Sequence, residues 1–208
     1  GCASGPISFM KVFNEATEAI NQGGFRRGAN MAVLRIDHPD ILDFIKIKQN
    51  EGVLTNFNIS VGVTDAFMQA VEKNQDFPLI NPRTRVVVKI LHARELFEQI
   101  VRSAWENGEP GILFLDTINA ANPTPLIGKI EGTNPCGEQP LLPFEACVLG
   151  SINLSRIVKL KNGIYEIDWD CLEGVIYRAV HFLDNIIDVN KYPLPQIEHL
   201  TKSNRKVG

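Results

Sequence analysis

The sequence lacks the cysteine patterns of several protein classes. Its 208 residues hold four cysteines, and no two have the C-x-x-C spacing of a zinc site. Four scattered cysteines are also too few for a disulfide scaffold in a chain of this length. We therefore expect a reducing, cytoplasmic environment and no metal site. The four cysteines are Cys2, Cys136, Cys147 and Cys171.

Long apolar runs and a strong excess of charge are missing too. No stretch approaches the roughly 20 apolar residues of a membrane-spanning helix, and residues 1–10 lack the features of a signal peptide. The net charge of −3 gives no overall attraction to nucleic acid or to an anionic membrane. We expect neither partner. The chain opens on Gly1 without a methionine and stops just after a helical pattern, so we expect a piece of a longer protein.

Helical and strand patterns alternate along the chain. Helical spacing of apolar residues covers residues 7–21, 41–49, 64–73, 93–107, 169–190 and 195–204. Strand patterns cover residues 30–36, 56–63 and 112–116, and hairpins are expected within 77–90 and at 161–164. This alternation predicts an α/β fold with a largely parallel sheet, either open or closed into a barrel. The continuous apolar run at 112–116 predicts a strand buried on both faces.

One cysteine lies in an unusual loop, Thr133–Pro140, whose sequence is T-N-P-C-G-E-Q-P. Asn134, Cys136 and Glu138 alternate, so on an extended segment they point to one side. A radical or nucleophilic sulfur, an acid/base group and an amide would then surround one small molecule. The alternative is a Pro/Gly turn around a buried structural cysteine, since cysteine often packs as a small hydrophobe.

A second unusual loop follows the first helix, at residues 21–28. Two glycines permit backbone conformations closed to other residues, two arginines offer forked donors, and a glutamine adds an amide. Such a loop suits the phosphates or the base of a nucleotide. The alternative is a glycine C-cap followed by a solvated basic turn. The residues concerned are Gln22, Gly23, Gly24, Arg26 and Arg27.

Taken together, three stretches resemble the catalytic large chain of ribonucleotide reductases. Residues 134–139 resemble the loop that carries the radical cysteine, residues 145–154 the segment of a reducing cysteine, and residues 22–30 the specificity loop that senses the effector. The resemblance extends over essentially all 208 residues. It implies that residues 1–208 form a single segment of a ten-stranded α/β barrel domain, truncated at both ends.

The loop N-P-C-G-E-Q-P-L-L-P is most similar to the adenosylcobalamin-dependent branch of that family. The branch that depends on iron or manganese more often has S-N-L-C-x-E and takes its radical from a second subunit. The resemblance thus implies adenosylcobalamin as cofactor, a dNTP as allosteric effector, a thioredoxin-type reductant and a homodimer. Two alternatives stay open: the branch with a separate radical-generating subunit, and a non-catalytic module that only binds dNTPs. Nucleic-acid binding through Arg26 and Arg27 is a weaker alternative, because an acidic chain offers no basic surface.

Carried over residue by residue, the resemblance implies a role for four side chains. Cys136 becomes a thiyl radical that abstracts the ribose 3′-hydrogen, and Glu138 accepts the proton of the 3′-hydroxyl. Asn134 holds Glu138 or a sugar hydroxyl, so Asn134, Cys136 and Glu138 contact the substrate, a ribonucleoside di- or triphosphate. Cys147 supplies reducing equivalents and forms a disulfide with a second cysteine.

The resemblance also implies that parts of the active site lie outside this sequence. The partner of Cys147 is expected upstream of Gly1, and Cys2 is not assigned to that role, because its position matches the approach to the effector site. The loop that binds the substrate phosphates is expected downstream of Gly208. We therefore expect the segment to be inactive alone.

Overall fold

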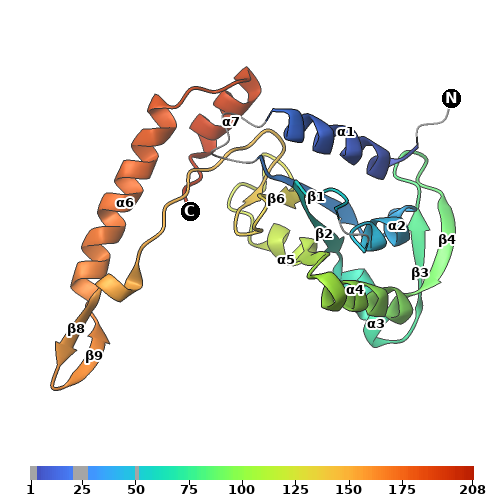
Figure 1. Cartoon of the computed structure of the whole chain (residues 1–208), viewed down its shortest axis with the longest axis horizontal. Helices are drawn as coiled ribbons and strands as arrows, with labels where there is room; N and C mark the ends of the chain where they lie inside the picture. The colour runs from blue at the N-terminus through green and yellow to red at the C-terminus, as the bar shows by residue number, and fades with distance from the viewer. Residues whose placement is uncertain (1–3, 21–27, 50–51) are drawn as a thin grey trace. The chain divides into compact units, whose positions relative to one another are not determined.

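A computed structural model describes residues 4–20, 28–49 and 52–208 of the chain (Figure 1). The chain divides into two compact units, residues 1–142 and 143–208. Each unit is considered by itself below. The specificity-loop residues Gln22, Gly23, Gly24, Arg26 and Arg27 lie outside the described residues, as does Cys2.

The first unit is organised around a three-stranded parallel sheet in the order β1-β2-β5. Strand β1 (Asn30–Arg35) pairs with β2 (Phe57–Val63) from Asn30–Phe57 to Arg35–Gly62. Strand β2 in turn pairs with β5 (Gly111–Phe114) from Ser60–Gly111 to Val63–Phe114. The parallel α/β arrangement that the alternation predicted is confirmed for this unit, and β2 is its central, most deeply buried strand.

The prediction for residues 112–116 is wrong in two respects. The strand ends at Phe114, and Leu115 starts helix α5 (Leu115–Ala120). The Asp116 carboxylate, in the first turn of this helix, accepts the Asp65 N–H at 2.8 Å. Strand β5 is also not buried on both faces: Ile112 and Leu113 are half-buried, and Phe114 is 47% exposed.

Helices α1–α4 also belong to the first unit. Their bounds are α1 (Pro6–Ala19), α2 (Ile41–Lys46), α3 (Asp65–Glu72) and α4 (Ala93–Asn107). The Thr64 hydroxyl caps α3 by accepting the Phe67 N–H at 3.2 Å. One hydrophobic cluster joins the helices to β2, and Phe44, Phe67, Val61, Leu96 and Ile100 are among its fully buried members.

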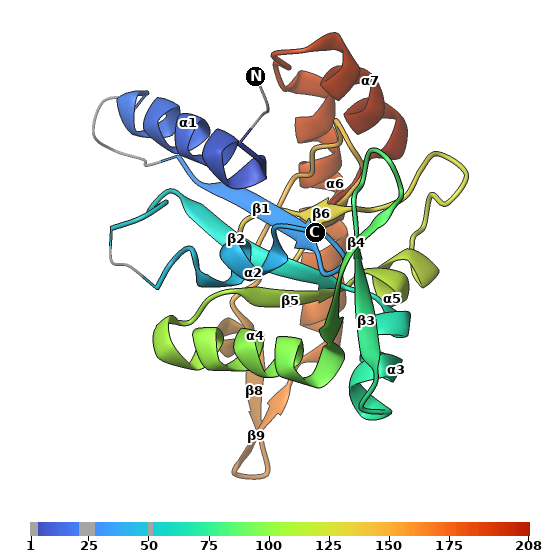
Figure 2. The same ribbon diagram turned by 90° about the vertical axis from the view of Figure 1, so that its right-hand side faces the viewer.

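Two hairpins complete the first unit. Strands β3 (Asp76–Ile80) and β4 (Val87–His92) form an antiparallel pair at the carboxyl end of the sheet (Figure 2). There the Ile80 N–H donates to the Asp37 carbonyl at 2.7 Å. The second hairpin, β6 (Gly132–Thr133) with β7 (Pro140–Leu141), carries the Cys136 loop, and β6 packs beside β1.

The second unit consists of a short 3₁₀ turn, a hairpin and two helices. These are η1 (Leu154–Arg156), β8 (Val158–Lys161), β9 (Ile164–Ile167), α6 (Trp169–Val189) and α7 (Pro195–Asn204). The hairpin turn predicted at 161–164 is confirmed: Asn162 and Gly163 have φ values of 53° and 81°. Primed hairpin turns need such positive φ values at both central residues.

The spacing of apolar residues over 169–190 predicts that the side chains of Val175, Ile176, Ala179, Phe182, Leu183, Ile186 and Ile187 face inward, and this prediction is only partly correct. Of the apolar positions predicted inward, Leu183 and Ile187 are buried, whereas Phe182 is 65% exposed and Ile176 44% exposed. Helix α6 packs mainly against α7 within this unit, and a single small neighbour covers only a narrow stripe of a helix.

The described strands form open sheets, and no closed barrel is present among residues 4–20, 28–49 and 52–208. None of the helices in this part of the chain has the length and apolarity to span a bilayer. The same residues contain no group of three or more His, Cys, Asp or Glu side chains placed to hold a metal ion.

Candidate functional site

Cys136 lies at the tip of a tight turn at the end of the β6–β7 hairpin. The Gly137 N–H donates to the Asn134 carbonyl at 3.0 Å, which closes a four-residue β-turn with Pro135 and Cys136 at its centre. Cys136, the third residue of the turn, has no positive φ. A type II turn needs a positive φ at this position and a type I turn does not, so the turn is of type I. Gly137, at φ 84°, then takes the left-handed conformation that returns the chain to β7.

The extended conformation assumed for this loop is therefore wrong, because Asn134–Gly137 form a turn. The turn still presents the predicted chemistry at the surface of its unit: the Cys136 thiol is free and exposed, and Glu138 is exposed as well. The alternative of a buried structural cysteine is excluded for this unit. A common face for Asn134, Cys136 and Glu138 stays a prediction.

Asn134 is the half-buried member of the three predicted residues. Its Oδ1 accepts the Gln139 N–H at 2.9 Å, and its own N–H donates to the Gln139 carbonyl at 3.2 Å. These bonds close the base of the turn. Its Nδ2 donates no hydrogen bond to the described part of the chain, so the amide hydrogens are available to a ligand. A contact with Glu138 or with a sugar hydroxyl stays a prediction.

A side chain that the sequence pattern did not single out also reaches this turn. The Nδ2 of Asn58, the second residue of β2, donates to the Pro135 carbonyl at 2.7 Å. The sequence predicts Asn58 only as part of a strand, and no local pattern distinguishes it, since its acceptor lies 77 residues along the chain. The bond places the Cys136 turn at the amino end of the parallel sheet, next to the start of β1.

Cys147 lies in the second unit, where its surroundings are different. It is half-buried, and its neighbour Val148 forms a parallel bridge with Val207. The Val148 N–H donates to the Lys206 carbonyl at 3.2 Å, and the Gly208 N–H donates to the Val148 carbonyl at 3.0 Å. The Cys147 segment is thus held beside the last residues of the chain.

A buried ion pair anchors the same segment. The Lys206 ammonium lies 2.6 Å from the Glu145 carboxylate, whose other oxygen accepts the Asn204 amide at 2.6 Å. The Glu145 side chain is 0% exposed and that of Lys206 is 12% exposed. A buried carboxylate requires such partners, because an unpaired charge in the interior is strongly destabilising.

Arg205 ties helices α6 and α7 together. Its guanidinium donates to Asp184 at 2.7 Å and to Asp188 at 2.9 Å. These hydrogen bonds hold the pKa of both carboxyls below the ordinary value of an aspartate and raise the pKa of Arg205. No sequence motif indicated this network.

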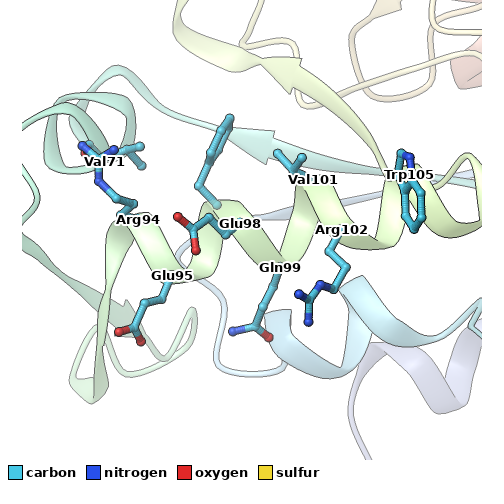
Figure 3. Close-up of a pocket in the computed structure, with 9 residues that line it drawn as sticks. Val71, Arg94, Glu95, Glu98, Gln99, Val101, Arg102 and Trp105 are labelled. Atoms are coloured by element: carbon cyan, nitrogen blue, oxygen red, sulfur yellow. The ribbon is translucent and has the colours of Figure 1, made fainter.

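Two hollows of the first unit lie away from the predicted residues. The larger, of about 910 Å³, follows the outer face of α4 and includes Arg94, Val101 and Trp105 (Figure 3). The other, of about 500 Å³, lies at the carboxyl end of the sheet and includes Arg35, Asp116 and other charged residues. Within the described part of the chain, neither is lined by Asn134, Cys136 or Glu138. The hollow along α4 lies beside a single helix and gives no indication of a reaction. We take the Cys136 turn, which holds the predicted residues, as the candidate site.

Known proteins of one family match the entire chain. The family model "Ribonucleotide reductase, barrel domain" matches residues 1–208. The vitamin B12-dependent ribonucleoside-diphosphate reductases of Thermoplasma acidophilum and Mycobacterium tuberculosis (strain CDC 1551) are 51% and 52% identical over the whole chain. The vitamin B12-dependent ribonucleotide reductase of Streptomyces coelicolor is 34% identical. The chain spans 27%, 30% and 24% of these three relatives, respectively.

These matches confirm the resemblance that the Cys136 and Cys147 motifs carried. With a family model covering every residue, the chain belongs to the ribonucleotide reductase family.

Proposed function

We propose that this chain is the central catalytic segment of an enzyme that reduces ribonucleotides to deoxyribonucleotides through a thiyl radical. The observation that carries the proposal is the exposed, free Cys136 thiol at the tip of a turn, with the exposed Glu138 two residues on. A thiol in this position is accessible both to an oxidant and to a substrate. The substrate is a ribonucleoside di- or triphosphate, and the named relatives favour the diphosphate.

The first step is a hydrogen-atom transfer at Cys136. The thiyl sulfur takes the 3′-hydrogen of the ribose, so that the C3′–H bond breaks, an S–H bond forms and the radical moves to C3′. Glu138 accepts the proton of the 3′-hydroxyl as general base. The C2′–O bond then breaks, and the 2′-hydroxyl leaves as water with a proton from one of the two reducing thiols described below. We assign Asn134 to substrate binding, since its amide hydrogens are available while its Oδ1 is held by the turn.

The loss of the 2′-hydroxyl must be balanced by two electrons and their protons. We assign this role to Cys147 together with a second cysteine, whose two thiols are oxidised to one disulfide while the sugar is reduced. A thioredoxin-type dithiol would then reduce that disulfide. At the end of the cycle the Cys136 S–H returns its hydrogen atom to C3′.

Adenosylcobalamin, the cofactor implied by the relatives' names, would supply the one-electron oxidation of Cys136 when it is bound. The exposed thiol at the tip of the turn fits this requirement, because a large group can approach it. Cys136 is the residue that would face the cofactor. No other residue of this chain is assigned to it.

Further features of the family stay proposals for this chain. We propose that residues 1–208 form one segment of a ten-stranded barrel, completed by other parts of a longer polypeptide. We also propose that residues 22–27 sense a dNTP effector, since β1 begins at Asn30, close to Asn58 and hence to the Cys136 turn. A homodimer and a cytoplasmic location remain predictions.

The decisive experiment replaces Cys136 by Ser in the intact enzyme that contains this chain. The hydroxyl is nearly isosteric, but its O–H bond is too strong to be formed and broken reversibly in this cycle. We expect ribonucleotide reduction to become undetectable while substrate binding and thermal stability are retained. Cys171→Ser is the matched control, because Cys171 is also an exposed, free thiol. Reduction at a normal rate by Cys136→Ser would refute the proposal.

A further inference from the structure

We propose that Asn58 is a positioning residue for the reaction, which sets the direction of the Cys136 thiol by holding the Pro135–Cys136 peptide group. The inference rests on the proposed function. Its basis is the 2.7 Å hydrogen bond from the Asn58 Nδ2 to the Pro135 carbonyl, which connects the central strand of the sheet to the turn.

The hydrogen bonds within the turn leave this peptide group unfixed. They join Gly137 to Asn134 and Asn134 to Gln139, so they close the turn and its base. Type I and type II turns share the same closing bond and differ by rotation of the central peptide through about 180°. Here the central peptide is Pro135–Cys136, and none of these internal bonds reaches its carbonyl.

Asn58 therefore supplies the restraint that the turn lacks. A carbonyl held from outside fixes the plane of the Pro135–Cys136 peptide, and that plane determines where the Cα–Cβ bond of Cys136 points. Hydrogen-atom transfer requires the sulfur and the sugar C–H to be close and aligned, so a small rotation of this plane affects the reaction directly.

The strand that carries Asn58 is itself held on both sides of this residue. The Lys48 ammonium donates to the Phe57 carbonyl, and the Glu109 carboxylate accepts the Ile59 N–H at 2.9 Å. Lys48 and Glu109 also form an ion pair, with both side chains largely buried. The neighbouring residues Phe57 and Ile59 belong to the core. A hydrogen bond from so constrained a position transmits the rigidity of the sheet to the turn.

The experiment compares three substitutions of Asn58 in the intact enzyme. Asn58→Asp keeps the shape but has no N–H donor at neutral pH, and Asn58→Ala removes the group. Asn58→Gln keeps the amide on a longer stem and serves as the conservative variant. Asn162→Asp, at the tip of the exposed β8–β9 hairpin, controls for the added negative charge.

We expect Asn58→Asp and Asn58→Ala to lower the single-turnover rate at saturating substrate by roughly ten- to a hundredfold. Substrate affinity and the thermal midpoint should stay at their wild-type values, and Asn58→Gln should recover part of the rate. Backbone hydrogen exchange should increase in the peptide covering residues 132–141 and remain unchanged in α4. A merely structural role would lower affinity or stability together with the rate.

Each result has a defined meaning. Wild-type single-turnover rates in both Asn58→Asp and Asn58→Ala overturn the inference, and so does a loss of rate that follows a loss of stability. Asn162→Asp should behave as wild type, and an equal loss in this control would also overturn it. The proposed function fails separately, by persistent activity of Cys136→Ser. If Cys136→Ser is inactive while Asn58→Asp and Asn58→Ala are both fully active, the role of Asn58 is refuted and the proposed function stands.

Discussion

The Cys136 turn and the Cys147 segment are both predicted to use sulfur chemistry, but they are built differently. The turn is exposed and is held by neutral hydrogen bonds from amides, including that of Asn58. The Cys147 segment is half-buried and is held by a parallel bridge and the buried Glu145–Lys206 pair. A neutral hydrogen bond at the surface can orient a group while it contributes little to the free energy of unfolding. A buried charge differs, because removing its partner strongly destabilises the fold.

The largest effect is expected from breaking the buried pair. Lys206→Met removes the ammonium group that lies 2.6 Å from the buried Glu145 carboxylate, and we expect the free energy of unfolding to fall by about 3–5 kcal/mol. The double variant Glu145→Gln, Lys206→Met should recover most of that loss, because no charge is then left buried. Urea unfolding of the two variants in the intact enzyme measures the difference. Equal losses in the single and the double variant would show that the pair does not act through its charge.

A smaller effect is expected from the backbone of the Cys136 turn. Gly137 has a φ of 84°, which a residue with a Cβ adopts at a cost of about 1–2 kcal/mol. Gly137→Ala should therefore lower the free energy of unfolding by about that amount. In Gly128→Ala, the matched control, the added Cβ makes only an ordinary contact, 3.6 Å from Leu142, at a position without positive φ. If chemical unfolding gave the same value for both variants, the left-handed conformation would not be the cause.

The smallest effect concerns the pH dependence of the second unit. Because Arg205 lowers the pKa of Asp184 and Asp188 in the folded state, both carboxylates stabilise the fold above the pKa of an unfolded aspartate, about 4. That stabilisation is lost as the pH falls through the lowered folded-state values. Arg205→Met should flatten the decrease of thermal midpoint below pH 4 by a small amount, since exposed ion pairs are screened by water. An unchanged acid slope in this variant would contradict the assignment.

Local sequence patterns correctly predicted those elements whose conformation depends on interactions within one short segment. The spacing of apolar residues predicted α4 over residues 93–107 and a helix over residues 64–73, where Thr64 caps α3. Asn162–Gly163 predicted the hairpin turn between β8 and β9. In each case the responsible interactions lie within one helical turn or one hairpin, so they are visible in a short window of sequence.

The predictions failed where the conformation or the burial of a segment depends on its contacts with other parts of the chain. The apolar run at 112–116 predicts a buried strand, but its last two residues, Leu115 and Asp116, begin helix α5, and the Asp116 carboxylate accepts the Asp65 N–H. Helix α6 has apolar residues around more of its circumference than one neighbour covers, so spacing alone overestimated its buried face. For the Cys136 loop, alternation suggested an extended segment, whereas the Gly137–Asn134 hydrogen bond closes a turn.

The sequence by itself predicted the family: the identity and spacing of Asn134, Cys136, Glu138 and Cys147 carried that prediction, and the matches confirm it. The tertiary structure alone decided what holds these groups. Asn58 meets Pro135 across 77 residues, and Lys206 meets Glu145 across 61. Residue types near a reactive group are local information, but the donor that orients a turn or the cation that neutralises a buried carboxylate is selected by the path of the chain through space.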